Sequence, residues 1–348
     1  MKAKQQILSA VELYRLSRNR RSRRLPRLSM HSYPGQPAIY YVAPEENRPS
    51  GGVRVIYRHV DMLNAMGMPA AVVHPHEGFR CTWFDNSTEV ISIKALRLRE
   101  EDILVVPEYH AAGLSAIPSS ARVVVFNQGP HHTFDLIPLR PSLPGWPYSH
   151  VTRLAGILTV SHDGAELLQA AFPAVRIGVA RNVVDRQIFH PPSEDRRQRI
   201  AFVPSRRADE LQEVLHFLNT LMELQTGQWE LMRLSGLSER GMAEALRSSS
   251  IFLSLSERDG FGLPPAEAMA CACYVVGYHG GGGREFFDPT YCAPVGSTTE
   301  LLSALIEAMN APKARLQEKG EKASARILGH YTAEGLITDL ESFYRELL

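Results

Sequence analysis

The chain has 348 residues, of which 44% are hydrophobic and 22% charged, so it can bury cores and is not disordered as a whole. This length predicts two domains of about 100–200 residues each. Four cysteines are too few for a disulfide scaffold, and the longest apolar stretch has 11 residues. A membrane-spanning helix needs about 20 apolar residues, so we expect a cytoplasmic protein without one.

Charge is distributed unevenly along the chain. The formal net charge is +1, but residues 1–30 hold nine basic side chains and one acidic one. Subtracting these from 38 and 37 leaves 29 basic and 36 acidic side chains, a net charge of −7 for residues 31–348. We predict a separate basic N-terminal segment, residues 1–30. Two interpretations stay open: residues 2–27 bind an anionic membrane surface, or they form a solvated tail.

The first half, residues 31–190, alternates strand-like and helical patterns. Short apolar runs predict strands, and apolar spacing predicts a helix over residues 53–66. The predicted strands are 39–43, 70–74, 102–107, 122–126 and 156–160. Four prolines within residues 138–147 predict a loop.

The second half, residues 191–348, starts after a proline-containing break at residues 189–192. Strands are predicted at 200–203, 230–234 and 251–255, and helices at 210–224 and 242–247. Residues 300–348 predict three helices, the last of which can cross back to the first domain. Alternating strands and helices imply parallel sheets. The expected class is therefore α/β, with two doubly wound Rossmann-like domains facing a cleft.

The most informative segment is residues 254–287. We expect Asp259 in a polar loop after a strand, and Pro264 at the start of a helix whose first turn holds Glu267. A helix N-terminus that follows a glycine-bearing loop can bind a phosphate or a sugar oxygen through free N–H groups. Taken singly, Asp259 is typical of a turn and Glu267 of a helix N-terminus.

Residues 259–270 read D-G-F-G-L-P-P-A-E-A-M-A. This resembles the E-G-F-G-L-P-x-x-E-A-M-A pattern of the family-4 retaining glycosyltransferases, which have the two-domain GT-B fold. The resemblance implies that Asp259 lies against the donor sugar and that Glu267 holds the nucleotide ribose. It places Phe261, Gly262, Leu263 and Pro264 at the sugar and diphosphate. Asp259 is one methylene shorter than the Glu of the pattern.

Weaker similarities suggest further donor-binding residues. Gly51 and Gly52 resemble the glycine-rich loop near the donor phosphate. The family pattern has an Arg and then a Lys after the first strand of the second domain. Here Arg206 and Arg207 stand alone, because no lysine occurs between Lys94 and Lys313. The two guanidinium groups can hold a diphosphate together, or one of them can be a surface residue.

Three side chains after the predicted strand 122–126 compete for a sugar or acceptor contact: Gln128, His131 and His132. Glycines 280–283 predict a flexible loop beside the site. No D-x-D motif is present, so we expect metal-independent chemistry, with neither a metal ion nor a cofactor apart from the donor substrate.

The resemblance implies transfer of a sugar from a nucleotide-diphospho-sugar to an acceptor hydroxyl with retention. The expected acceptor is a saccharide or a lipid-linked molecule, in cell-surface polysaccharide or glycolipid synthesis at the inner face of the membrane. Nucleic acid is not expected as a partner. The alternative is a non-catalytic nucleotide-sugar-binding partner subunit. Two differences from the family pattern favour it: Asp259 in place of Glu, and the missing lysine. Another GT-B chemistry, epimerase or phosphorylase, is a more remote alternative.

Overall fold

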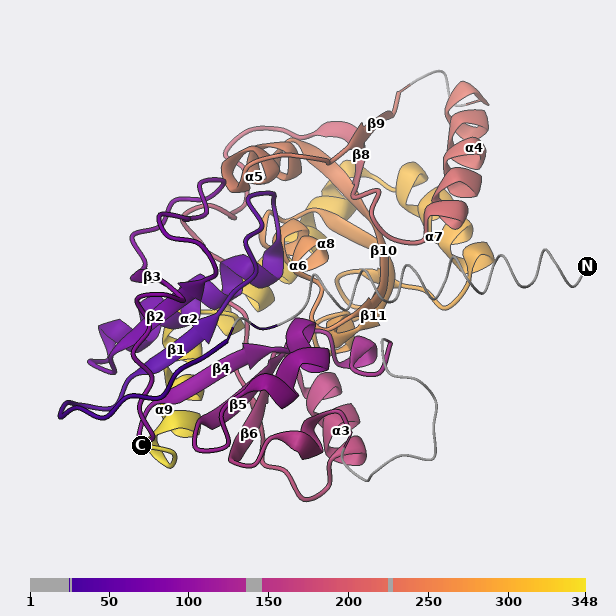
Figure 1. Ribbon diagram of the computed structural model, residues 1–348. Coiled ribbons are helices and arrows are strands. Elements are labelled where there is room, and N and C mark those ends of the chain that lie inside the picture. Colours follow the sequence, from indigo (N-terminus) through magenta and orange to yellow (C-terminus); the bar gives the residue numbers. More distant parts are fainter. Residues whose placement is uncertain (1–24, 26, 136–145, 225–227) are drawn as a thin grey trace, which may run out of the picture.

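Two parallel sheets, each built from one half of the chain, form the frame of the molecule (Figure 1). The structure is a computed structural model that describes residues 25, 27–135, 146–224 and 228–348. The elements named below belong to these residues. Most of the basic N-terminal segment and most of the proline-rich segment 138–147 lie outside them. The two parallel α/β sheets confirm the predicted fold class.

The first sheet has seven strands in the order β3-β2-β1-β4-β5-β6-β7. They are β1 (Ile39–Val42), β2 (Ala70–His74), β3 (Val90–Ser92), β4 (Ile103–Pro107), β5 (Arg122–Asn127), β6 (Leu154–Thr159) and β7 (Ile177–Val179). The helices α2 (Gly51–Ala65) and α3 (His162–Ala171) and the short helix η1 (Glu108–Ala116) connect strands. The sequence did not predict β3 and β7, because three-residue edge strands are too short to show a period.

The second sheet has five strands in the order β12-β11-β10-β8-β9. They are β8 (Arg197–Phe202), β9 (Glu230–Arg233), β10 (Ser249–Asp259), β11 (Tyr274–Gly281) and β12 (Ala293–Pro294). Its helices are α4 (Ala208–Leu224), α5 (Glu239–Arg247), α6 (Leu263–Ala270), α7 (Thr298–Asn310) and α8 (Lys313–His330). The three helices predicted after residue 300 are present: α7, α8 and α9 (Ala333–Arg345).

The C-terminal helix α9 packs against the first sheet rather than the second. It contacts α2 and β7, and it lies beside β1 and α2 in Figure 1. The hydroxyl groups of Tyr41 in β1 and Tyr344 in α9 are 2.8 Å apart and hydrogen-bonded. One buried apolar cluster therefore runs from the first sheet through α2 to α6 and α9, and this shared core holds the two halves in one arrangement.

Within the described residues, no helix combines the length and the apolar character that crossing a bilayer requires.

Candidate active site

The largest cavity among those found in the described residues lies between the two sheets and has a volume of about 710 Å³. Both halves of the chain line it, at the carboxyl ends of their strands, where open α/β sheets place ligands. Most of the predicted site residues meet here. They are Gly51, Gly52, Gln128, Arg206, Asp259, Phe261, Gly262, Leu263, Pro264 and Glu267. Arg207 and His131 do not line the cavity.

The turn between β10 and α6 differs from the sequence expectation in two details. Asp259 is the last residue of β10, not part of a loop, because β10 runs eight residues beyond Ile251 through its pairing with β11. Glu267 is the fifth residue of α6, which has no acidic residue in its first turn. The interaction with the helix N-terminus therefore does not explain Glu267, since that effect is confined to the first turn.

The first turn of α6 has few free backbone donors. Pro264 and Pro265 have no N–H, and the amide of Ala266 donates to the Gly262 carbonyl oxygen. The amides of Phe261, Gly262 and Leu263 remain. Gly262 has φ +96°, a left-handed conformation that favours glycine. The turn can therefore present a short row of N–H groups, whereas Pro264 can offer only an apolar contact.

Loops from the two sheets touch at glycines. A Cβ at Gly260 would lie 1.9 Å from the main-chain oxygen of Gln128, and one at Gly51 would lie 2.7 Å from Cδ1 of Leu263. The side-chain amide of Gln128 donates to the Gly52 carbonyl oxygen at 3.0 Å. A larger residue at position 260 would push the sheets apart, because it would meet backbone, whereas at position 51 the end of the Leu263 side chain would have to move.

The two adjacent arginines have different environments. Arg206 lines the cavity, and its Nε donates to Oδ1 of Asp259 at 3.1 Å. The guanidinium of Arg207 stacks on the ring of Tyr278 at 3.9 Å and pairs with Glu210 at 3.1 Å. Arg207 also has φ +44°, a left-handed backbone conformation, and its side chain points away from the cavity that Arg206 lines. Only Arg206 of the pair is therefore placed to meet a ligand in the cavity.

His131 lies at a second contact between the halves, outside the cavity. Its Nε2 is 3.2 Å from Oδ2 of Asp163, and Asp163 also pairs with Arg284 at 3.2 Å. His132 instead pairs with Asp135. The expectation of a flexible loop at residues 280–283 is wrong. These glycines end β11 and begin a single-turn helix, Gly282–Glu285. Close packing holds them: Gly280 and Gly282 lie against the end of β10 and the residues that follow it, and Gly281 lies against His131 and Asp163 of the first half.

Sequence reasoning missed an ion cluster beside the cavity. Arg54 in α2 donates Nη1 to Oε1 of Glu239 at 2.7 Å and Nη2 to Oε1 of Glu267. Arg58 also donates to Oε1 of Glu239, at 3.0 Å. The sequence did carry a signal. Like charges four residues apart destabilise an isolated helix, so arginines at 54 and 58 indicate acidic groups opposite them.

Burial and charge act against each other in this cluster. Burial raises the pKa of Glu267, and Arg54 opposes that rise. Burial alone would lower the pKa of Arg54, but the carboxylates of Glu267 and Glu239 raise it. The arginine is therefore charged, and its charge favours the ionised form of Glu267.

The described residues contain no group of three or more His, Cys, Asp or Glu side chains arranged to hold a metal ion. The four cysteines are free and buried, and Cys271 and Cys273 pack in the core. These residues therefore give no structural evidence for a metal centre.

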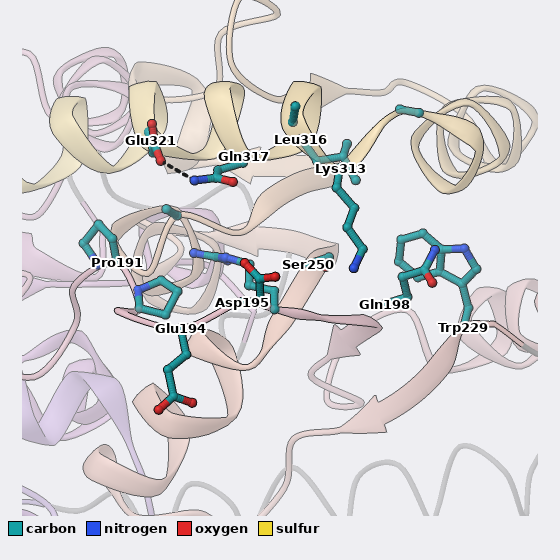
Figure 2. Close-up of a pocket in the computed structure, with 15 residues that line it drawn as sticks. Pro191, Glu194, Asp195, Gln198, Trp229, Ser250, Lys313, Leu316, Gln317 and Glu321 are labelled. Carbon is teal, nitrogen blue, oxygen red and sulfur yellow. Dashed lines mark hydrogen bonds between the residues drawn. The ribbon is translucent and has the colours of Figure 1, made fainter.

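A smaller cavity of about 290 Å³ lies between residues 191–198 and α8 (Figure 2). Lys313 extends toward it from α8, and Gln317 bonds to Glu321 across one turn of that helix. None of the predicted site residues lines it. The larger cavity between the sheets is therefore the candidate active site.

Comparisons with known proteins agree with this location. The family model "Glycosyl transferase-like" matches residues 197–342, which include β10, α6 and Glu267. The chain is 26% identical over 257 residues to an alpha-1,6-glucosyltransferase of Actinobacillus pleuropneumoniae serotype 7, covering 67% of this chain and 71% of that protein.

Two solved structures share the fold over nearly their whole length. Sucrose-phosphate synthase from Thermosynechococcus elongatus superposes with a TM-score of 0.63 at 11% identity, covering 90% of this chain and 99% of that one. HepE of Anabaena, in complex with UDP and glucose, also gives 0.63, at 12% identity, covering 89% and 100%. These likenesses confirm the GT-B fold. Residues 197–342 therefore match a glycosyltransferase family, and the chain as a whole is similar in sequence and fold to GT4-type retaining glycosyltransferases.

Proposed function

We propose that the protein transfers a sugar, with retention, from a UDP-sugar to an acceptor hydroxyl within the cavity between the sheets. One observation carries the proposal: residues from both halves of the chain line the same cavity, namely Asp259, Glu267, Arg206 and the first residues of α2, Gly51 and Gly52. The bound UDP and glucose of HepE suggest a UDP-sugar as the first donor to test.

Each residue has a proposed role in this reaction. Glu267 accepts hydrogen bonds from the ribose hydroxyls, and Asp259 orients the donor sugar. Arg206 neutralises the charge that develops on the departing diphosphate, together with the amides of Phe261, Gly262 and Leu263. Fixed positive charge and N–H donors supply this stabilisation without a metal ion.

The proposed division of labour follows the two halves. Residues 31–190 form the acceptor domain, on which α9 packs, and the other residues of 191–348 form the donor domain. Gln128 donates a hydrogen bond to Gly52 at the start of α2. His131 contacts the acceptor only after a rearrangement, because in this structure its ring faces Asp163 instead.

The test is turnover of UDP-glucose by the purified protein, followed as UDP release with mono- and oligosaccharide acceptors. Glu267→Gln should abolish UDP binding, and the anomeric configuration of the product reports retention. Tight UDP binding without turnover of any nucleotide-sugar would favour the alternative, a non-catalytic nucleotide-sugar-binding subunit. Sugar interconversion without an acceptor would indicate an epimerase.

We also propose that residues 2–27 bind an anionic membrane surface, which suits a lipid-linked acceptor in cell-surface polysaccharide or glycolipid synthesis. Support comes from the net charge of +8 in residues 1–30, since each basic residue near such a surface contributes about 1 kcal/mol. In a flotation assay with phosphatidylserine vesicles, the full chain should float and a variant with Arg20, Arg21, Arg23 and Arg24 changed to Gln should not. Equal flotation of the two proteins would refute this.

A further inference from the structure

One guanidinium joins helices that belong to different sheets. Arg54 lies in the first turn of α2, while Glu239 begins α5 and Glu267 lies in α6. The side chains of Arg54 and Glu267 are each 6% exposed, and that of Glu239 is 7% exposed. Two separate N–H groups of Arg54 bind the two carboxylates. The contact with Glu239 holds the guanidinium in one orientation. Because the guanidinium is held, its second contact restrains the direction of the Glu267 carboxylate.

Arg54 leaves part of the Glu267 carboxylate free for a ligand. A carboxylate has about four lone-pair sites, and the hydrogen bond from Nη2 uses one of them, on Oε1. Among the described residues, only Arg54 donates a hydrogen bond to the side-chain carboxylate of Glu267. The residue nonetheless lines the cavity. Hydroxyl donors that enter the cavity can therefore reach a carboxylate that is already oriented.

The charges around Glu267 explain why an arginine is needed there. The groups that act on it are Arg54, Arg58, Glu239 and the thiol of Cys271. Burial and the like charge of Glu239 both favour the protonated form of Glu267, whereas Arg54 and Arg58 favour the ionised form. Without Arg54, Arg58 is the remaining cation of the described residues that opposes protonation, and the hydrogen bonds and ion pairs of Arg58 in this part of the chain go to Val183, Asp185 and Glu239.

An aromatic ring completes the setting of Arg54. Its Cζ lies 5.9 Å from the ring centroid of Trp83, which also lines the cavity. A cation beside an aromatic face gains electrostatic stabilisation in a buried site. Two carboxylates and an indole ring therefore hold the guanidinium in place.

We propose that Arg54 is a positioning residue, which keeps the Glu267 carboxylate ionised and oriented toward the hydroxyl groups of the bound nucleotide. This inference rests on the proposed role of Glu267 as the group that binds the ribose. Because Arg54 acts through Glu267, its loss should weaken nucleotide binding most where Glu267 becomes protonated. As pH rises, Glu267 ionises again and binding should recover.

The test measures the affinity of the full chain for UDP by calorimetry. Arg54→Met should weaken UDP binding by about tenfold or more at the acidic end of a pH series, and the loss should shrink as pH rises and Glu267 ionises. The loss is the ratio of the two proteins' affinities at each pH, so the titration of UDP itself cancels. A loss that is equal at every pH would indicate only structural damage and would overturn the proposal.

Two further variants guard against misfolding. Arg54→Lys keeps the charge but loses the second contact, so UDP binding should weaken by only a few fold, with the pH profile of the unchanged protein. A profile that instead matches the expectation for Arg54→Met would overturn the proposal. Arg58→Met is the matched control one helical turn away, and it should move the pH profile less than Arg54→Met.

Glu267→Gln separates this inference from the function on which it rests. If this variant binds UDP as well as the unchanged protein, the ribose role of Glu267 is wrong, and the role of Arg54 falls with it. If Glu267→Gln loses UDP while Arg54→Met binds normally at every pH, only the inference about Arg54 is wrong.

Discussion

Nε of Arg206 donates a hydrogen bond to Oδ1 of Asp259 at 3.1 Å, which joins the segment after β8 to the end of β10. The side chain of Arg206 is 49% exposed and that of Asp259 is 17% exposed. Such a solvent-screened pair adds little to the free energy of unfolding. We therefore expect both residues to matter for the donor and hardly at all for the fold.

Asp259→Asn keeps the size of the side chain and removes its charge. We expect kcat with a nucleotide-sugar donor to fall by about 100-fold, as is typical when a preorganised polar group beside a reacting centre is lost. The free energy of unfolding should change by less than about 0.5 kcal/mol. Donor turnover and urea unfolding measure the two effects, and an unaltered kcat would remove Asp259 from the site.

Arg206→Gln and Arg207→Gln form a matched pair of neighbouring substitutions. Arg206→Gln should lower kcat/KM for the donor by about 100-fold, because the cavity loses a cation near the diphosphate. Arg207→Gln should cost about 1 kcal/mol of stability through the lost stack on Tyr278 and leave turnover nearly intact. The opposite ranking in steady-state kinetics would mean that Arg207 is the phosphate ligand.

Gly260→Ala tests the close contact between the sheets. Its methyl group would lie 1.9 Å from the Gln128 carbonyl oxygen, which is backbone and cannot rotate away. We expect a loss of about 2 kcal/mol or more in the free energy of unfolding, with weaker UDP binding. Gly329 in α8 is the control, because an added Cβ meets nothing within 4 Å there. Gly329→Ala should be neutral or stabilising by about 0.5–1 kcal/mol, and equal effects at both positions would contradict the model of the contact.

His59 makes stability depend on pH. Burial lowers the pKa of this α2 side chain from its ordinary value of 6.5 to about 3. Between those values the unfolded chain binds a proton that the folded chain does not, so stability falls as pH drops from 6.5 toward 3. This histidine alone should cost about 2 kcal/mol between about pH 7 and pH 5.

His59→Gln should remove that part of the pH dependence, measured by urea unfolding at both pH values. His216, which is exposed on α4, is the control, because it contacts water in the folded and the unfolded state alike. A pH dependence that persists in His59→Gln would show that other groups produce it.

Local patterns were sufficient for most of the longer strands and for the C-terminal helices, but they placed Asp259 in a loop rather than at the end of β10. They depend on apolar periodicity and on prolines and glycines, whose effects act over a few residues. The segment D-G-F-G-L-P-P-A-E also pointed to the family, because it holds many site residues within one short stretch. The same reasoning placed Glu267 one turn too early, since helix ends depend on φ values such as that of Gly262.

The residues themselves thus determined the α/β class, the family and the acidic pair at 259 and 267. Arg54 reaches Glu267 across 213 positions of the chain, and no local pattern could pair them, because that contact exists only after the two sheets pack. The same packing separates Arg206, which faces the cavity, from Arg207, which lies on Tyr278. Side-chain direction at such positions follows from burial and long-range contacts, which a linear sequence does not contain.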